Sequence, residues 1–381
     1  MKKIVSLLLA VLFAFSVLGL VGCGKINDAS VAILWSGDGV ATDPNSLINS
    51  MDRAMYIEKI AYEHYGAKGD AAEQVKQAKA ALDAGCAALV VEPVTALIAQ
   101  EIVDAAKAKD VPVIFVKTAQ NIPQSVVDSY DKCVTIVSDT NTLSEVEGKL
   151  IADYIKANFK KLDKNQDGKI TYYASDYYDL TRISVFAVDK ANELLATEDY
   201  VVKGADKKEI NTFVEPGNIV EFDHKNIDPT EYELILTIDD QAAFEVLCML
   251  QEKGYNTDKL TTHFVPVITL GDTVDYKAYV VEQGKDKYEE NKYLVDLTTV
   301  SEEDLEAMIY TTRNVISAGR LAGTVIADDD AIAGAAAKIV ANLIKGKDKF
   351  DGVASEVKEG EAASVVVDGA SVKVRFIALT E

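Results

Sequence analysis

Short apolar runs alternate with longer amphipathic stretches along this chain, and the alternation starts a second time about halfway. The first series predicts strands at 31–35, 88–92 and 111–116, with helices at 71–84 and 96–109. The second predicts helices at 142–159, 181–196 and 241–254, with strands at 170–175, 232–238 and 265–270. Unbroken β-branched runs separated by helices indicate buried parallel strands with helical crossovers. The sequence therefore predicts an α/β fold of two Rossmann-like lobes, each built on a parallel sheet.

This arrangement also predicts where a ligand would bind. In open α/β sheets, ligands bind beyond the carboxyl ends of the strands, at the point where the strand order reverses. If two such sheets face each other, that rule places a single cleft between them. The length of 381 residues, roughly twice that of a typical domain, agrees with two lobes.

The N-terminus resembles an export signal. A basic start at residues 1–3 is followed by an apolar run over 4–21 and by the sequence Leu-Val-Gly before Cys23. That sequence resembles the bacterial lipoprotein box, in which Cys23 is lipidated after removal of residues 1–22, with 23–30 as a short linker. We therefore expect a protein anchored by lipid on the extracytoplasmic face of the cell membrane. An uncleaved membrane anchor is the alternative, because the run is nearly long enough to span a bilayer.

Charge and cysteine content exclude further classes of function. The formal net charge of −22 becomes −24 once Lys2 and Lys3 leave with the signal. Such acidity argues against nucleic-acid binding, which needs basic surfaces, and favours solubility. The remaining cysteines form no C-x-x-C pair, so we expect three buried small hydrophobic side chains. They are Cys86, Cys133 and Cys248.

Residues 163–171 have the oxygen spacing of a calcium loop. Oxygen-bearing side chains stand at loop positions 1, 3, 5 and 9, and glycine stands at position 6, where the sharp turn falls: Asp163, Asn165, Asp167, Thr171 and Gly168. Position 12, a bidentate Glu in an EF-hand, is Ala174 here. A bound Ca²⁺ would therefore need its last ligand from elsewhere in the chain. The alternative is an ordinary polar turn, since Asp, Asn and Gly dominate turns.

Catalysis finds little support in the sequence, and we expect no enzyme. It contains no G-x-S-x-G, no G-x-x-x-x-G-K-[ST] and no H-E-x-x-H motif. The three histidines, His64, His224 and His263, are scattered and form no recognisable pair with a nucleophile.

Residues 85–138 resemble the periplasmic galactose/glucose-binding proteins, members of the type I periplasmic binding protein family, down to Asp-Ser-Tyr-Asp-Lys at 128–132. A second match is Leu321–Ile326 followed by a helix ending at Gly346. The resemblance covers about 31–381, and the segment between Asp272 and Arg320 is longer than in that family. Proteins of that family carry one calcium loop whose missing ligand is a Glu at the start of a later strand. The resemblance therefore implies structural Ca²⁺ bound by Asp163, Asn165, Asp167, Lys169, Thr171 and Glu233.

The same resemblance implies how the chain is divided and what it does. One lobe would comprise 31–138 plus 327–374, and the other 139–326 plus 375–381, joined by a hinge of three crossovers. A monosaccharide would bind between lobes that close by hinge motion, and the protein, a monomer, would deliver it to an ABC transporter permease. Alternatives are a ligand sensor for a membrane kinase or chemoreceptor, and a nucleoside- or sugar-acid-binding protein of the same fold. A DNA-binding repressor with this body would need a helix-turn-helix where the export signal stands.

The resemblance also implies ligand-binding positions. Sugars present paired hydroxyls, which carboxylates, amides and Arg satisfy, and an apolar ring face, on which an aromatic side chain stacks. The implied residues are Trp35, Asp38, Lys117, Asp179, Arg182, Phe213, Asp239, Asp272 and Asp328. Phe213 is the candidate stacking residue, and Trp35 is the alternative. Each Asp could instead cap a helix next to a strand end.

Two departures from the family pattern concern this set. Lys117 and Ala327 stand where that family has Asn, and Asp239 also occupies an Asn position. A pocket that loses amides and gains a cation is not expected to hold glucose in the same pose. We expect Lys117 to pair with Asp239 or Asp272 across the closed cleft, or with an anionic group of the ligand.

Overall fold

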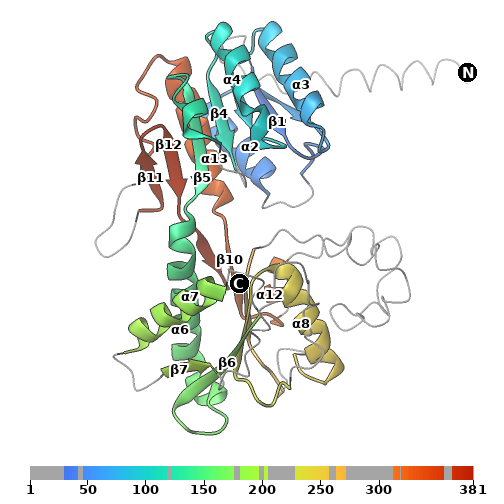
Figure 1. The fold of residues 1–381 in the computed structure, drawn as a ribbon, viewed down its shortest axis with the longest axis vertical. Coiled ribbons are helices and arrows are strands. Elements are labelled where there is room, and N and C mark those ends of the chain that lie inside the picture. The colour runs from blue at the N-terminus through green and yellow to red at the C-terminus, as the bar shows by residue number, and fades with distance from the viewer. Residues whose placement is uncertain are drawn as a thin grey trace, which may run out of the picture.

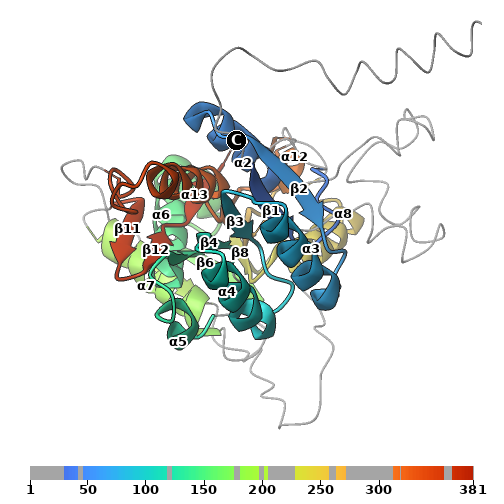
Figure 2. The same cartoon turned by 90° about the horizontal axis from the view of Figure 1, so that it is seen from above.

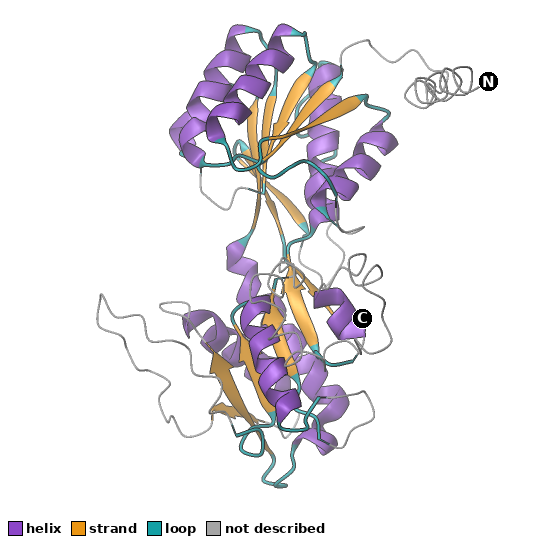
Figure 3. Cartoon of the chain, turned by 90° about the vertical axis from the view of Figure 1, so that its right-hand side faces the viewer, coloured by secondary structure: helices purple, strands orange, loops and turns teal. Residues whose placement is uncertain are grey.

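The computed structural model describes residues 30–41, 46–117, 122–175, 181–196, 201–204, 228–256, 263–271, 312–317, 319–355 and 363–380. Two sheets dominate these residues, and helices cover both faces of each sheet (Figure 1, Figure 3). The predicted α/β fold with two lobes built on largely parallel sheets is confirmed.

The first sheet has seven strands in the order β11-β12-β5-β4-β3-β1-β2. They are β1 (Val31–Trp35), β2 (Tyr62–Gly66), β3 (Ala88–Val91), β4 (Val113–Val116), β5 (Cys133–Ser138), β11 (Val365–Asp368) and β12 (Ser371–Val374). All neighbours pair in parallel except β11 and β12, which form an antiparallel edge. The strand order reverses between β1 and β3, because the chain continues from β1 to β2 on one side and returns to β3 on the other.

Helices cover both faces of this sheet because its strands are apolar on both sides. Successive side chains point to opposite faces, so Val31 and Ile33 of β1 pack with α2 and α13, whereas Ala32 and Leu34 pack with α3 and α4. Figure 2 shows α2 and α13 on one side and α3, α4 and α5 on the other. The helices are α2 (Leu47–Glu58), α3 (Ala71–Asp83), η1 (Ala96–Ile98), α4 (Ala99–Ala108), α5 (Gln124–Val127) and α13 (Asp329–Ile344).

The second sheet has six strands in the order β13-β10-β9-β8-β6-β7, parallel except for β13. They are β6 (Lys169–Ser175), β7 (Val201–Gly204), β8 (Leu234–Thr237), β9 (Val267–Leu270), β10 (Gly323–Ile326) and β13 (Ile377–Leu379). One face packs on α6 and α7 and the other on α8 and α12. The helices are η2 (Thr140–Thr142), α6 (Leu143–Leu162), α7 (Thr181–Leu195), α8 (Asp240–Glu252) and α12 (Thr312–Ser317).

The chain passes between the sheets three times: after β5, after β10 and after β12. Two of these passages are joined by hydrogen bonds. The Asp139 N–H donates to the Val374 carbonyl at 2.7 Å, and the Phe376 N–H donates to Thr142 Oγ1 at 3.3 Å. Arg375 also pairs with Glu145 of α6 at 3.1 Å. These contacts bind the first and third passages into one two-stranded hinge segment.

The predicted strands and helices are confirmed within one to three residues wherever the structure describes them. Among the described strands, β2, β5, β7, β11, β12 and β13 were not predicted, and β10 lies in the matched segment 321–326. The exact division of the chain into lobes stays a prediction. Of the described residues, no helix is both long and apolar enough to cross a membrane.

Candidate functional site

The carboxyl ends of the parallel strands in the two sheets face each other. All three passages leave the first lobe at this end: β5 and β12 run out of it into the second lobe, and β10 runs back into α13 (Figure 1). We call the residues that follow β1, β3 and β4, together with the start of α13, the first-lobe face. The rule for open α/β sheets places a ligand there, and most sharply where the strand order reverses between β1 and β3.

Glu92 stands at that reversal point, directly after β3. Its Oε2 accepts hydrogen bonds from the Ser36 hydroxyl at 2.8 Å and from the Ser36 N–H at 3.3 Å. Gln74, fully buried on α3, holds the backbone on either side of Pro93: its Nε2 donates to the Glu92 carbonyl and its Oε1 accepts from the Val94 N–H, both at 2.8 Å. Glu92 is therefore a half-buried carboxylate held in place by neutral donors, with one carboxylate oxygen outside the Ser36 bonds.

Asp38 lies in the exposed loop that follows β1. Its Oδ1 accepts from the Val40 N–H at 3.0 Å, which closes a local turn and leaves the side chain accessible. The loop lies on the end of β2, where a Cβ at Gly66 would come within 2.0 Å of the Asp38 carbonyl oxygen. Glycine at position 66 is therefore what allows the loop to approach β2 so closely. Asp38 therefore lies on the first-lobe face, and its role in binding a ligand stays a prediction.

Lys117 follows β4 with a backbone φ of +47°, a region that residues other than glycine rarely adopt. Its Nζ lies 3.6 Å from Asp329 Oδ2 at the start of α13, and the two side chains are 37% and 18% exposed. The predicted pairing with Asp239 is therefore not what this structure contains: Lys117 pairs within its own lobe, because α13 begins directly beside the end of β4. Asp272, the other predicted partner, lies outside the described residues.

Asp328 also belongs to the first-lobe face. Its Oδ1 accepts from the Ala331 N–H at 2.9 Å and so caps α13. Burial raises the pKa of this carboxyl, and the negative charge of Asp330 adds to that effect. Its hydrogen bonds to the helix N–H groups oppose the shift.

The second lobe contributes Asp239, which follows β8. Its Oδ1 accepts from the Ala242 N–H at 2.7 Å and caps α8, and the residue remains exposed. Its neighbour Asp240 is 2% exposed and accepts a hydrogen bond from the Thr312 hydroxyl at 3.3 Å. Asp179 and Phe213 lie outside the described residues, as does Cys23. Arg182 belongs to α7, but its side chain is outside the described part.

Trp35 does not occupy the position expected of a residue that stacks on a sugar. The ring is 2% exposed and belongs to the core between the first sheet and α2, because its position in β1 places it on the face with Val31 and Ile33. Its Nε1–H donates to His64 Nδ1 at 2.7 Å. Trp35 therefore offers no open ring face on which a sugar could stack in this structure.

Glu233 tethers the calcium-like loop. It is 5% exposed, precedes β8 and directs both carboxylate oxygens at the loop backbone. Oε1 accepts from the Lys164 N–H at 2.8 Å, and Oε2 accepts from the Thr171 N–H at 2.9 Å. The predicted spatial relation between the loop and this distant Glu is therefore present, although the two are more than sixty positions apart in the chain.

Inside the loop, the side-chain oxygens bend back on the backbone. Asp163 accepts from the N–H groups of Asp167 and Gly168 at 3.0 and 3.1 Å, and Asn165 accepts from the Asp167 N–H at 3.0 Å. Among the described residues, no group of three or more His, Cys, Asp or Glu side chains gathers as a ready metal site. The donor set is all oxygen, which suits a hard cation. The carboxylates themselves are held by backbone N–H groups, and metal binding at the loop stays a prediction.

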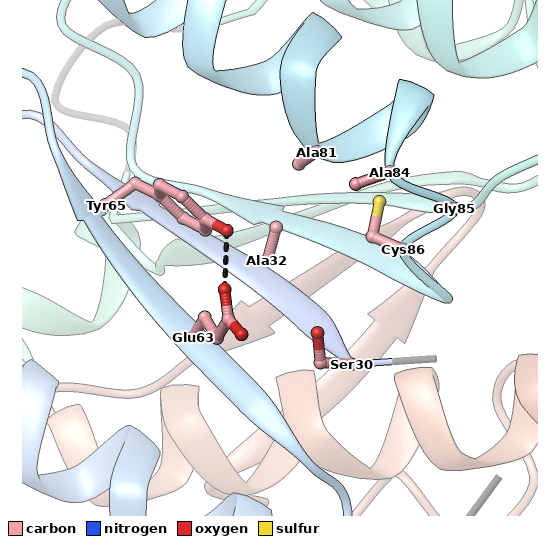
Figure 4. A pocket seen from close by; sticks show the side chains of 8 residues that line it. All are labelled: Ser30, Ala32, Glu63, Tyr65, Ala81, Ala84, Gly85 and Cys86. Carbon is pink, nitrogen blue, oxygen red and sulfur yellow. Dashed lines mark hydrogen bonds between the residues drawn. The ribbon is translucent and has the colours of Figure 1, made fainter. Parts of the chain in front are cut away.

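A small cavity of about 230 Å³ lies at the opposite, amino end of the first sheet, between β2 and the end of α3 (Figure 4). Tyr65 donates its hydroxyl proton to Glu63 at 2.7 Å, and Cys86 lines the far side. Burial raises the pKa of the Cys86 thiol to about 11, so the thiol stays protonated and is not a ready nucleophile. The cavity is remote from the first-lobe face and shows no catalytic arrangement. The expected burial of Cys86 and Cys133 is confirmed, while Cys248 is half-buried.

A family model described as "Periplasmic binding protein domain" matches residues 45–348. The chain belongs to this family. Membership implies an extracytoplasmic location and a role in binding a solute. It agrees with the geometry above, in which the polar ends of two parallel sheets face each other.

The chain is similar to several solved structures. AraP, an arabinose-binding protein from Geobacillus stearothermophilus, is 11% identical with a TM-score of 0.52, over 93% of this chain and 97% of that one. A mutant XylFII–LytSN complex is 10% identical with a TM-score of 0.52, over 92% of this chain and 98% of that one. A solute-binding protein of an ABC transporter from Bacillus halodurans, with bound myo-inositol, is 13% identical with a TM-score of 0.44, over 94% and 96%. The two structures with a TM-score of 0.52 establish the fold and leave the ligand open.

Sequence reasoning missed Ser36, Glu92 and Gln74. The signal that could have found them is the position of Glu92 at the end of a predicted strand, next to Pro93. A charged residue that directly ends a buried parallel strand lies at the edge of the sheet where ligands bind.

Proposed function

We propose that this protein is an extracytoplasmic lipoprotein that binds a monosaccharide between its two lobes and delivers it to an ABC transporter. A hexose of the galactose or glucose type is the first candidate ligand. Structural calcium at the loop of residues 163–171, completed by Glu233, belongs to the same proposal, as does lipidation at Cys23.

The observation that carries the proposal is the set of acceptors held at the first-lobe face. Glu92 is fixed by Ser36 at 2.8 Å, and Asp38 is exposed in the neighbouring loop. A carboxylate that already has one neutral partner and keeps a second oxygen can accept a hydroxyl of the ligand, which is how proteins bind the hydroxyls of a sugar. Asp239, at the end of β8 in the second lobe, supplies an acceptor to the opposite side when the lobes close.

The charge balance favours a neutral ligand over a sugar acid. The one lysine named at this face, Lys117, already lies 3.6 Å from Asp329. An incoming carboxylate would have to compete with Asp329 and would meet Glu92, Asp38 and Asp328 nearby. Repulsion between the negative charges would oppose binding of an acid, whereas neutral hydroxyls can pair with carboxylates without that repulsion.

Calcium is supported by the donor set and by the two hydrogen bonds that direct the Glu233 carboxylate at the loop. Lipidation is supported by the Leu-Val-Gly-Cys sequence at 20–23. Mass spectrometry of the protein from a membrane fraction tests lipidation. A diacylated Cys23 at the mature N-terminus supports it, and a protein that still carries residues 1–22 contradicts it.

The ligand is tested by differential scanning fluorimetry of the mature chain against hexoses, pentoses, inositol, uronic acids and nucleosides. A ligand present at a hundredfold excess over its Kd should stabilise the folded protein by about 2.7 kcal/mol. A shift with a neutral monosaccharide and none with its uronic acid is the expected result. Shifts only with nucleosides or acids would overturn the sugar assignment.

Isothermal titration calorimetry of variants then tests the site. Glu92→Gln keeps the shape and removes the charge, so sugar affinity should fall about tenfold or more, as expected for loss of a charge-assisted hydrogen bond. Glu63→Gln, a matched change on β2 at the opposite end of the sheet, should leave affinity unchanged. Equal affinity of Glu92→Gln and wild type would remove Glu92 from the site. Co-purification from solubilised membranes with a permease supports transport, and co-purification with a sensor kinase instead contradicts it.

A further inference from the structure

His64 joins three neighbouring elements of the first lobe through one chain of side chains. The indole Nε1–H of Trp35 on β1 donates to His64 Nδ1 on β2 at 2.7 Å, and His64 Nε2 lies 2.7 Å from Asp52 Oδ1 on α2. The imidazole and indole rings stack with centroids 5.8 Å apart and planes at 25°. The side chains of His64 and Asp52 are 23% and 38% exposed, so solvent protons reach these two residues while the indole stays buried.

The indole determines where His64 carries its proton. An indole N–H can only donate, so Nδ1 of the imidazole must offer its lone pair. The single proton of the neutral ring therefore sits on Nε2 and is donated to Asp52. A second proton can only go to Nδ1, where it would point at the indole N–H. Protonated His64 must therefore give up the bond to Trp35, while its attraction to Asp52 grows.

Tyr62 and Asp52 both contact the imidazole ring of His64. The rings of Tyr62 and His64 meet edge-on with their centroids 5.3 Å apart, and Tyr62 is also hydrogen-bonded to Asp52. Burial, followed by the bond to Asp52 and its charge, raises the pKa of Tyr62 to about 12, so the phenol keeps its proton. Asp52 is the charged group found against the ring among the described residues. Histidine is the side chain that normally changes charge between about pH 5 and 8.

Trp35 connects the hydrogen-bonded side chains of His64 and Asp52 to the first-lobe face. It is the last residue of β1, and the loop after it carries Ser36 and Asp38. The loop folds back over the indole: a Cβ at Gly39 would lie 3.2 Å from Trp35 Cδ1. The Ala67 N–H donates to the Trp35 carbonyl at 3.1 Å, which fixes the backbone at the same point. A shift of the indole therefore reaches the loop directly.

We propose that His64 is a proton-binding site that controls Trp35 and, through it, the loop of residues 36–40. Neutral His64 holds the indole in place; protonated His64 releases the indole and pairs with Asp52. This goes beyond solute binding and holds whichever solute the protein takes, so its failure would be independent of the sugar assignment.

Tryptophan fluorescence tests the proposal directly because Trp35 is the only tryptophan in the chain. Emission of the ligand-free mature protein is followed from pH 8 to pH 5. Since the indole Nε1–H loses its acceptor when His64 is protonated, wild-type emission should change in a single one-proton transition. His64→Gln should lose that transition. His263→Gln, the matched change at an exposed histidine of the second lobe, should keep it.

Nitrogen-15 NMR of the histidine rings gives a second reading that does not depend on a variant folding. At pH 8 the His64 ring should be the Nε2–H tautomer, and the amide signals of residues 36–40 should shift with the same midpoint as its ring nitrogens. An Nδ1–H tautomer at pH 8 would overturn the proposal. So would pH-independent emission in wild type, or a transition that survives in folded His64→Gln.

Discussion

Replacing Glu233 by alanine should separate the structural role of this carboxylate from any role in binding calcium. Its two oxygens accept N–H bonds from Lys164 and Thr171 at 2.8 and 2.9 Å, and the residue is 5% exposed. Hydrogen bonds to a charged group contribute about 1.5–3 kcal/mol each. Relief of the cost of burying the charge offsets part of the loss, so we expect about 3 kcal/mol of destabilisation in chelator.

For a lobe of this size, such a loss lowers Tm by roughly 6–12 °C. Calcium at a hundredfold excess over its Kd should add about 2.7 kcal/mol to wild type and nothing to Glu233→Ala or Asp163→Ala. Calorimetry in chelator and in calcium measures both effects. Because the chain has two lobes, the comparison uses the transition that responds to the substitution rather than one global midpoint.

Two variants sharpen this comparison. Glu233→Gln keeps one acceptor oxygen, so it should lose about half as much stability and still fail to respond to calcium. Glu231→Ala, at an exposed position two residues earlier, should melt like wild type in both conditions. If Glu233→Ala melts within 2 °C of wild type in chelator, the tether inferred from the hydrogen bonds is wrong. If wild type melts identically in calcium and in chelator, the loop is a polar turn without a metal.

Three further predictions concern the first lobe. Gly66→Ala should destabilise the first lobe by at least about 1–3 kcal/mol in urea unfolding, because the new Cβ would lie 2.0 Å from the Asp38 carbonyl oxygen. Gly37→Ala should be neutral, because a Cβ there would meet no atom within 4 Å. Gln74→Ala should cost about 1–3 kcal/mol for each of the two backbone groups it leaves unpaired, and an unchanged urea midpoint would contradict the bridge. The pKa of Asp328 is raised in the folded state, so folding favours its protonated form, and its contribution to stability declines as the pH rises through that pKa. Asp328→Asn keeps the cap and should flatten this pH dependence in thermal melts from pH 4 to 7. An unaltered slope would refute the assignment.

Much of the fold could be predicted because its strands are apolar on both faces. The runs at 88–91 and 113–116 are short, apolar and β-branched and are fully buried, which is typical of central parallel strands. Strand β2 was missed because Tyr-Glu-His-Tyr-Gly shows neither an apolar run nor a clean alternation. It forms at the edge of the sheet, where β1 supplies its hydrogen-bond partners. Only the folded neighbour makes that segment a strand.

The site was predicted unevenly, for a similar reason. Asp38, Lys117 and Asp328 follow strand ends, which the sequence marks. The Ser36–Glu92 pair is 56 positions apart and forms because β1 and β3 are in register, with Leu34 opposite Val91. Sequence alone does not contain that register. Trp35 was misplaced because it lies on the same face of β1 as Val31 and Ile33, which packs against α2.

Lys117 shows how the fold can supply a partner for a charge that the sequence alone leaves unpaired. A cation in place of an amide predicts an anionic ligand when the sequence is considered alone. In the fold, α13 begins beside β4 and presents Asp329 to Lys117 at 3.6 Å, so the lobe itself supplies the opposing charge. The left-handed backbone at Lys117, with φ at +47°, is tolerated at the same place. The charge of Lys117 is therefore paired within the lobe, which agrees with the neutral ligand proposed above.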